Sequence, residues 1–201
     1  MRNSALTEPN SQRMKNNSGK VFGVGWAKTG TTTLGKCFEL LGFEHQSQRL
    51  DLVKDLARRD LSRIIALANL KDSFEDWPWI LLCRELDQAF PGSRFILTRR
   101  DSARWLRSYQ NMLRNQGGPS AEMNDIRQIL YGLPFPQVTG QQLIERYEAH
   151  NQDVIAYFGD RCEHLLVVDW ERGAGWKDLC EFLKKRIPNE PFPHANPENY
   201  S

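Results

Sequence analysis

One segment near the start of the chain constrains the fold more than any other. A short apolar run, VFGVGW (residues 21–26), leads through a glycine-containing loop into a helical pattern, in which Leu34, Phe38 and Leu41 recur before Gly42. A strand followed directly by a helix is the first half of a βα unit. The segment therefore predicts an α/β fold from its first element onward.

The same alternation continues along the chain. Further strands are predicted at residues 73–77, 94–98 and 164–170. Helices are predicted at residues 50–70, 80–90, 101–113, 140–158 and 176–186, with a lid or excursion at 115–139 around a short helical piece at 125–130. Because the strands are continuous apolar runs, we expect a three-layer sandwich in which helices cover both faces of a central parallel sheet.

The length and the local composition indicate one folded unit. Residues 1–19 are rich in Asn and Ser without periodicity and predict a disordered tail. The remaining residues, 20–201, are expected to form a single domain, which suits a chain of 201 residues.

The charge, the hydropathy and the cysteine spacing argue against several classes of protein. The formal net charge is only +2 and its basic excess lies in the first 20 residues, so no nucleic-acid footprint is expected. No apolar run approaches the roughly 18 residues of a membrane span. The four cysteines are far apart and form no CxxC pair, which favours reduced thiols, no structural zinc and a cytoplasmic location.

The loop after the first strand has the features of an anion site. Gly25 and Gly30 match the glycine spacing of a Walker A loop, but the lysine is at position 28 and three threonines follow Gly30. Backbone N–H groups at such a junction point at one spot, and the helix dipole adds positive potential there. The loop therefore predicts a bound phosphate or sulfate.

The KTGTT sequence after a strand resembles the donor loop of sulfotransferases, which bind 3′-phosphoadenosine 5′-phosphosulfate (PAPS) and release 3′-phosphoadenosine 5′-phosphate (PAP). The resemblance extends in order over most of residues 20–196 and implies a P-loop NTPase-like sulfotransferase fold and no metal. It assigns Lys28 to the bridging oxygen as the sulfuryl group leaves. It assigns the cradle of the 5′-phosphate to Thr29, Gly30, Thr31, Thr32 and Thr33.

A second motif lies about seventy residues later. Arg100 ends a predicted strand at the sheet edge where α/β folds bind ligands, and Ser108 shares a helical stripe with Trp105 and Met112. The resemblance implies that Arg100 and Ser108 bind the 3′-phosphate of the donor. The alternatives are an ion pair of Arg100 with Asp101 or a neighbouring acid, and a Ser108 hydroxyl bonded to its own helix.

Transfer to a hydroxyl needs a general base, and four residues are candidates. Asp76 stands where cytosolic sulfotransferases carry a histidine, and burial beside Trp77 and Trp79 would raise the pKa of its carboxyl group. It could equally cap the helix that follows. The candidate histidines are His45, expected to face solvent, His150, expected in the core, and His194, expected in a tail contact.

The sequence leaves the acceptor open within one chemical class. Trp77, Trp79, Tyr131 and Phe135 suggest a small-molecule or glycan acceptor with an apolar or aromatic part, unless these rings are core. The function predicted first is in-line sulfuryl transfer from PAPS to a hydroxyl or amine. The alternatives are a P-loop kinase or NTPase, with residues 165–169 as a Walker B strand, and an inactive nucleotide-binding protein of this fold.

Overall fold

The computed structural model describes residues 19–115 and 120–193. The tail expected over residues 1–19 lies outside this part except for Gly19, and His194 lies outside it as well.

The described residues contain one sheet of five parallel strands in the order β2-β3-β1-β4-β5. The strands are β1 (Val21–Gly23), β2 (His45–Gln46), β3 (Ser73–Phe74), β4 (Arg94–Thr98) and β5 (Leu165–Val168). In the centre, Val21 is in register with Ser73 on one side and Arg94 on the other. The predicted α/β fold with a central parallel sheet is confirmed.

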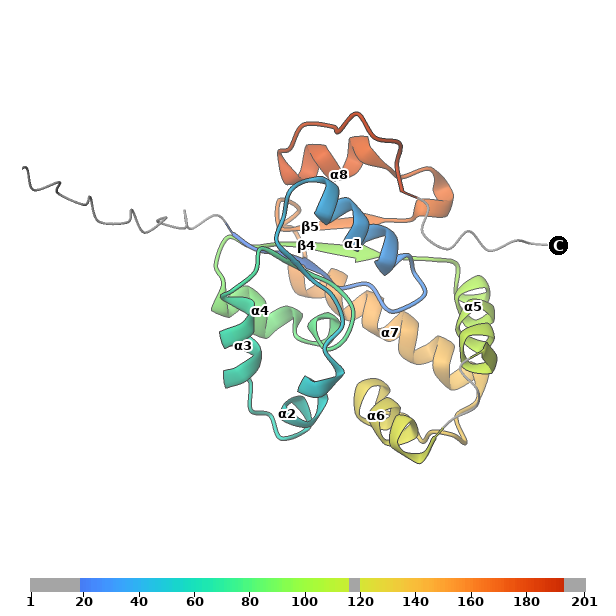
Figure 1. The fold of residues 1–201 in the computed structure, drawn as a ribbon. Helices are drawn as coiled ribbons and strands as arrows, with labels where there is room; N and C mark the ends of the chain where they lie inside the picture. Colours follow the sequence, from blue (N-terminus) through green and yellow to red (C-terminus); the bar gives the residue numbers. More distant parts are fainter. Residues whose placement is uncertain (1–18, 116–119, 194–201) are drawn as a thin grey trace, which may run out of the picture.

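Helices cover both faces of this sheet (Figure 1). They are α1 (Thr31–Leu40), α2 (Val53–Ala57), α3 (Ser62–Ala68), α4 (Cys83–Ala89), α5 (Ser102–Asn115), α6 (Ala121–Tyr131), α7 (Gly140–Phe158) and α8 (Trp176–Leu183). In Figure 1, α1 and α8 lie on one face and α3, α4 and α7 on the other, while α5 lies beyond the end toward which β4 points.

The central strands β1 and β4 are largely apolar because side chains on both faces of the sheet are buried. Phe22 and Phe95 pack into the core under α3, α4 and α7, with ring centroids 5.3 Å apart. Their neighbours Val21 and Ile96 pack on the opposite face, against α1 and α8. Because successive side chains point to opposite faces and both faces are buried, no polar alternation remains.

A third core lies at the carboxyl ends of the strands. We call this core the aromatic cluster. In it, Trp105 stacks on Tyr147 with 4.4 Å between ring centroids. Its ring-bearing members are Trp26, Trp77, Trp105, Tyr109, Tyr131, Phe135 and Tyr147. The aromatic cluster joins the loop after β1 to α5, α6 and α7.

The helix expected at residues 50–70 is wrong as a single element. A 3-10 turn at Leu50–Leu52 leads into α2, and α3 follows only after a break. Arg59 lies in the break with φ 57°, and the Asp60 carboxylate accepts the backbone N–H of Ser62 at 3.1 Å. A left-handed residue cannot continue an α-helix, so the amphipathic pattern is divided between two short helices.

Other boundaries also differ. The strand expected at residues 73–77 ends at Phe74, and the helix expected at 80–90 begins as a 3-10 turn, Trp79–Leu81, before α4. The short piece expected at 125–130 is the longer helix α6, whose first turn is capped by the Ser120 hydroxyl. Strand β2 was not predicted, because two residues of mixed polarity carry no periodic signal.

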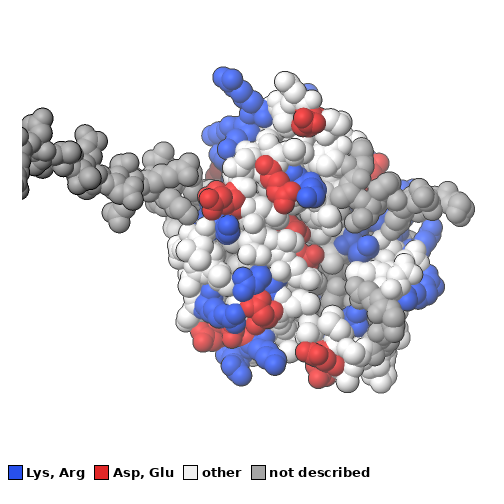
Figure 2. Space-filling model, in the orientation of Figure 1, with Lys and Arg blue, Asp and Glu red and all other residues white. Residues whose placement is uncertain are grey.

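On the face shown in Figure 2, Lys and Arg side chains lie close to Asp and Glu side chains, so charge of both signs is mixed there. Within the described ranges, none of the helices combines the length and the apolar character that crossing a membrane would require.

Candidate active site

A cavity of about 640 Å³ opens at the carboxyl edge of the sheet. Each of the five strands contributes a residue from the loop that follows it, and these are Lys28, Gln48, Asp76, Arg100 and Glu171 after β1, β2, β3, β4 and β5, respectively. The strand order changes direction here, since β1 pairs with β3 on one side and β4 on the other. Ligands of open α/β folds bind at this place, and the volume is typical of ligand pockets.

The loop between β1 and α1 is held from three sides. The Thr29 hydroxyl donates to the Trp26 carbonyl and lies 2.6 Å from the Thr98 hydroxyl, and Trp105 Nε1 donates to the Ala27 carbonyl at 3.0 Å. Because these bonds occupy it, the Thr29 hydroxyl braces the loop in this structure instead of facing a phosphate. The loop is therefore fixed before any ligand binds.

Both glycines of the loop are required by close packing. A Cβ at Gly25 would lie 2.0 Å from Thr98 Oγ1, and one at Gly30 would lie 2.4 Å from Trp170 Cδ1. Gly30 also has φ 95°, and Lys28 adopts φ 73°, a conformation that is costly for a residue with a side chain. The glycine spacing noted in the sequence thus reflects a loop pressed against β4 and Trp170.

The first turn of α1 is suited to an anion. Its N-cap, Gly30, supplies no side-chain cap, and its first turn contains no acidic residue. Thr31, Thr32 and Thr33 of this turn line the cavity. Backbone N–H groups and the helix dipole therefore attract negative charge at this end, called the donor end below.

Arg100 is fixed at the donor end by contacts on its backbone and its side chain. Its backbone N–H donates to the Tyr147 hydroxyl at 2.9 Å, and this hydroxyl donates to the Arg100 carbonyl at 3.0 Å. Its guanidinium lies 2.6 Å from Glu171 Oε1, and Arg104 also pairs with Glu171, at 3.2 Å. The alternative of an ion pair is thus observed, with Glu171 as partner instead of Asp101, while Arg100 still lines the cavity.

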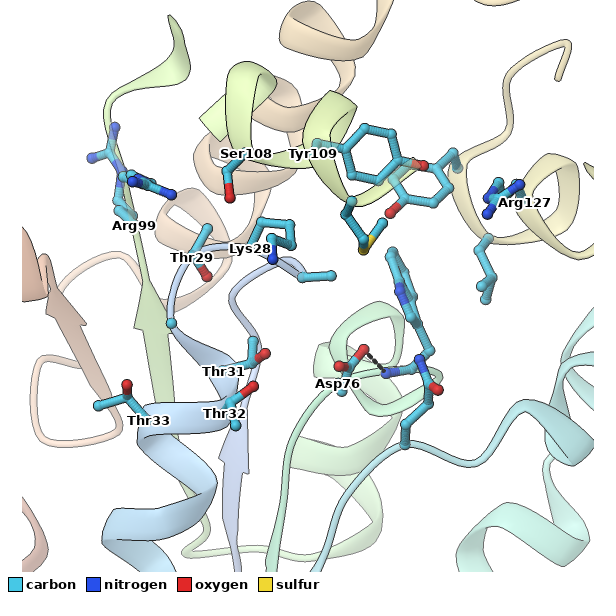
Figure 3. Close-up of a pocket in the computed structure, with 18 of the residues that line it drawn as sticks. Lys28, Thr29, Thr31, Thr32, Thr33, Asp76, Arg99, Ser108, Tyr109 and Arg127 are labelled. Carbon is cyan, nitrogen blue, oxygen red and sulfur yellow. Dashed lines mark hydrogen bonds between the residues drawn. The ribbon is translucent and has the colours of Figure 1, made fainter. Parts of the chain in front are cut away.

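Ser108 lies on α5 and is only 2% exposed. Within the described residues its hydroxyl forms no hydrogen bond with its own helix, so the alternative expected for it is not observed. Figure 3 shows the hydroxyl near Lys28 and Thr29, on the side where Arg99 lies. Arg99 was not predicted, although it also lines the cavity next to Arg100.

Asp76 follows β3 in a left-handed conformation with φ 68°. Its carboxylate accepts the backbone N–H of Trp77 at 2.8 Å and so does not cap the following helix (Figure 3). Burial, and then the neighbouring Glu75, raise the pKa of Asp76 to about 6, against the hydrogen bonds from Trp77 and Gln48. Asp76 thus combines access to the cavity with a basicity above that of an ordinary aspartate.

None of the three described histidines, His45, His150 and His164, lines this cavity. The solvent-facing position expected for His45 is wrong: its side chain is 8% exposed, with Nδ1 3.0 Å from Ser73 Oγ and Nε2 3.5 Å from Glu75 Oε1. Pairing of β2 with β3 places it there. His150 is a core histidine as expected, with Nε2 2.7 Å from the Val24 carbonyl, and burial lowers its pKa to about 4.

The other end of the cavity, called the acceptor end below, is largely aromatic. Of the four predicted aromatic residues, Trp77 and Tyr131 line it, whereas Trp79 is 0% exposed and donates through Nε1 to the Ser47 carbonyl. Phe135 does not line it either. Trp79 and Phe135 belong to the cores, which was the alternative left open.

The sequence interpretation missed Tyr109, Met112 and Arg127 at the acceptor end. A signal for Arg127 exists, because it interrupts a helical stripe of Met123, Ile126, Leu130 and Tyr131, all of which line the cavity. A charged residue inside an apolar stripe is unusual in a helix that packs on a core. The stripe was not visible while the helix was assigned only to residues 125–130.

Asp169, the aspartate of the suggested Walker B run, directly follows strand β5. Its carboxylate accepts the Glu171 N–H at 3.0 Å and pairs with Arg172 at 3.4 Å. In the part of the chain that is described, no group of three or more His, Cys, Asp or Glu residues is arranged to hold a metal ion.

Comparison with known proteins agrees with this arrangement. A family model described as "Sulfotransferase domain" matches residues 20–200. The chain is also similar to "Ava biosynthesis cluster protein M" of Aspergillus versicolor, with 26% identity over 142 residues that cover 61% of this chain. The match spans about half, 53%, of the length of that relative. With a family match over nearly all of the described residues and a phosphate-type loop at the carboxyl edge of a parallel sheet, the chain belongs to the sulfotransferase domain family.

Proposed function

We propose that this chain transfers a sulfuryl group from PAPS to a hydroxyl or amine of a small acceptor, without a metal. The carrying observation is that one cavity has an anion-binding end and an aromatic end. Lys28 belongs to the donor end and Asp76 faces the acceptor end.

The residues at the donor end fit a nucleotide with two anionic groups. The first turn of α1, with Thr31 and Thr32, would hold the 5′-phosphosulfate, because this turn lacks both a side-chain cap and an acid. Arg100 and Ser108 would hold the 3′-phosphate, and the aromatic cluster keeps the backbone of Arg100 in place through Tyr147.

In the reaction the acceptor oxygen takes the sulfuryl group from PAPS, and PAP keeps the electron pair of the broken S–O bond. The Lys28 ammonium stabilises the negative charge that develops on the leaving oxygen. The Asp76 carboxylate accepts the proton of the attacking hydroxyl. With a pKa of about 6, Asp76 is mostly ionised at neutral pH and still a stronger base than an ordinary aspartate.

The kinase and NTPase alternative remains testable by the same experiment. In a Walker A loop the lysine follows the second glycine, whereas here Thr31 follows Gly30 and Lys28 precedes it. Lys28 therefore approaches the anion from another side of the loop than a Walker A lysine does. In this proposal, that side is where the leaving oxygen of PAPS lies.

The test is thermal unfolding with PAP, and separately with ATP or ADP and Mg²⁺. At about 100 times Kd a ligand adds about 2.7 kcal/mol of stability, and each kcal/mol raises Tm by roughly 2–4 °C in a chain of this size. We expect a shift of several degrees with PAP that Arg100→Ala abolishes, and little with ATP. A shift with Mg-ATP alone would overturn the proposal in favour of a phosphotransferase, and PAP binding without turnover on any acceptor would favour an inactive binding protein.

A further inference from the structure

The acceptor end contains a buried cation that the sequence interpretation missed. Arg127 of α6 is only 6% exposed and lines the cavity together with its apolar neighbours Ile126, Leu130 and Tyr131. A guanidinium costs much free energy to bury, and arginine is rarely placed in such a stripe. Its position at a cavity wall, and not in the closed core, is therefore the feature to explain.

The charged groups that act on the two phenols of this end are Arg127 and Asp76. Burial raises the pKa of Tyr131 well above its ordinary value and also raises the pKa of Tyr109, so both phenols stay protonated, while the charge of Arg127 opposes each shift. The negative charge of Asp76 also acts on Tyr131. Arg127 and Asp76 are thus a cation and a base that share the same aromatic wall.

A second observation points to a ligand at this end. The Tyr109 hydroxyl is buried beside the Tyr131 hydroxyl, which acts on its pKa, but it has no hydrogen bond of normal distance and angle within the described residues. A buried hydroxyl without a well-formed hydrogen bond is destabilising, so a polar group of a bound molecule would stabilise it. Figure 3 shows Tyr109 and Arg127 together at the end of the cavity opposite Arg99, with Asp76 apart from both.

We propose that Arg127 binds a carboxylate of the acceptor, so that the acceptor is a hydroxylated aromatic acid. The planar guanidinium fork matches a carboxylate in two parallel hydrogen bonds. Trp77 and Tyr131 provide flat apolar surfaces for a ring, and the hydroxyl at the far side of the ring meets Asp76. This inference rests on the proposed sulfuryl transfer and narrows its acceptor.

The test uses three phenolic acids, para-hydroxybenzoate, para-hydroxyphenylacetate and para-hydroxyphenylpropionate, each paired with its primary amide. Transfer is followed as PAP released from PAPS, and binding is measured by titration into the PAP-saturated protein. The amide keeps the ring and the hydroxyl and removes only the charge. We expect at least one acid to exceed its amide at least tenfold in both kcat/KM and affinity.

The substitution Arg127→Gln should bring the ratio of acid to amide close to one and leave the Kd for PAP unchanged within twofold. Arg107→Gln, an exposed arginine of α5 that does not line the cavity, is the matched control and should keep the ratio. Arg127→Lys retains the charge without the fork and should lower the ratio severalfold; it decides the question if Arg127→Gln does not fold.

Three outcomes overturn the inference. The ratio could be the same in the Arg127 variants as in the wild type, or the amides could bind as well as the acids. The third is that PAP binds but none of the acids does, which rejects the acceptor class and leaves the donor site intact. Failure of PAP itself to bind is distinct, because it rejects the proposed function and this inference together.

Discussion

The guanidinium of Arg100 lies 2.6 Å from Glu171 Oε1, so the ends of β4 and β5 are joined by an ion pair inside the cavity. The Arg100 side chain is 10% exposed and that of Glu171 is 30% exposed. The pair orients Arg100 toward the cavity, yet it also places a negative charge where a phosphate is proposed to bind. Binding of the donor must therefore share or displace this contact.

Arg100→Ala should weaken PAP binding more than tenfold, because a hydrogen bond to a charged group contributes roughly 1.5–3 kcal/mol. Glu171→Gln should instead strengthen PAP binding about fivefold, since the competing carboxylate loses its charge. Both affinities are measured by isothermal titration, with Arg107→Ala as the neutral control on α5. Weaker PAP binding in Glu171→Gln would mean that the pair is needed to orient Arg100.

Asp76→Asn should lower kcat by roughly 10²- to 10⁴-fold at unchanged PAP affinity, because the proton acceptor is lost while its hydrogen bond from Trp77 is retained. In the wild type kcat/KM should rise with pH through about 6, as the Asp76 carboxyl group loses its proton. Glu75→Gln removes the neighbouring charge that helps to raise this pKa, so the midpoint should move to lower pH. A pH profile that is the same in Glu75→Gln and in the wild type would contradict this role.

Asp76→Asn should also stabilise the fold at neutral pH. The pKa of Asp76 rises from 3.8 to about 6 on folding, so the folded state holds the proton more tightly and stability falls as pH rises between these values. Above pH 6 Asp76→Asn removes this cost, with an upper limit of about 3 kcal/mol. Thermal unfolding should show a higher Tm for the variant at pH 7.5 and a difference that vanishes as pH approaches 3.8. Equal Tm values throughout would show that the ionised carboxylate costs nothing in the folded state.

Lys28→Gly and Lys28→Ala separate the charge of this residue from its backbone conformation. Both lack the ammonium group, so both should lose about 10²-fold in kcat. Only glycine adopts φ 73° without a Cβ clash, so Lys28→Gly should be more stable than Lys28→Ala by about 0.5–1 kcal/mol. Turnover in a PAP-release assay and urea unfolding give the two readouts. Wild-type turnover in either variant would remove Lys28 from the mechanism.

Gly30→Ala should weaken PAP binding more than tenfold, because its Cβ would lie 2.4 Å from Trp170 Cδ1 and force the loop to move. Gly42→Ala is the matched control, with φ 78° and no atom within 4 Å of the added Cβ. It should cost only about 1 kcal/mol of stability from its backbone and leave PAP binding intact. If the two variants bind PAP equally well, the packing of the loop on Trp170 is not needed for the donor.

Short sequence patterns predicted the positions of several site residues. The apolar runs that form β1, β4 and β5 and the glycine spacing from Gly25 to Gly30 are properties of short segments, so the sequence located the donor loop and the residues that follow β4, Arg100 among them. Because all of these strands are parallel, their carboxyl ends meet at one edge, and Lys28, Asp76, Arg100 and Ser108 line one cavity as that topology implies. Their roles stay predictions.

What the tertiary structure decided are the partners of these residues. Glu171 opposite Arg100, Gln48 beside Asp76, and Arg127 at the acceptor end all come from segments distant in sequence. Which side chains meet across such distances depends on how helices and loops pack together, and no local periodicity encodes that packing. The sequence by itself therefore determined the fold class and the position of the glycine loop, whereas the charged and polar neighbours of the site residues were decided by the packing of α6, β2 and the loop after β5.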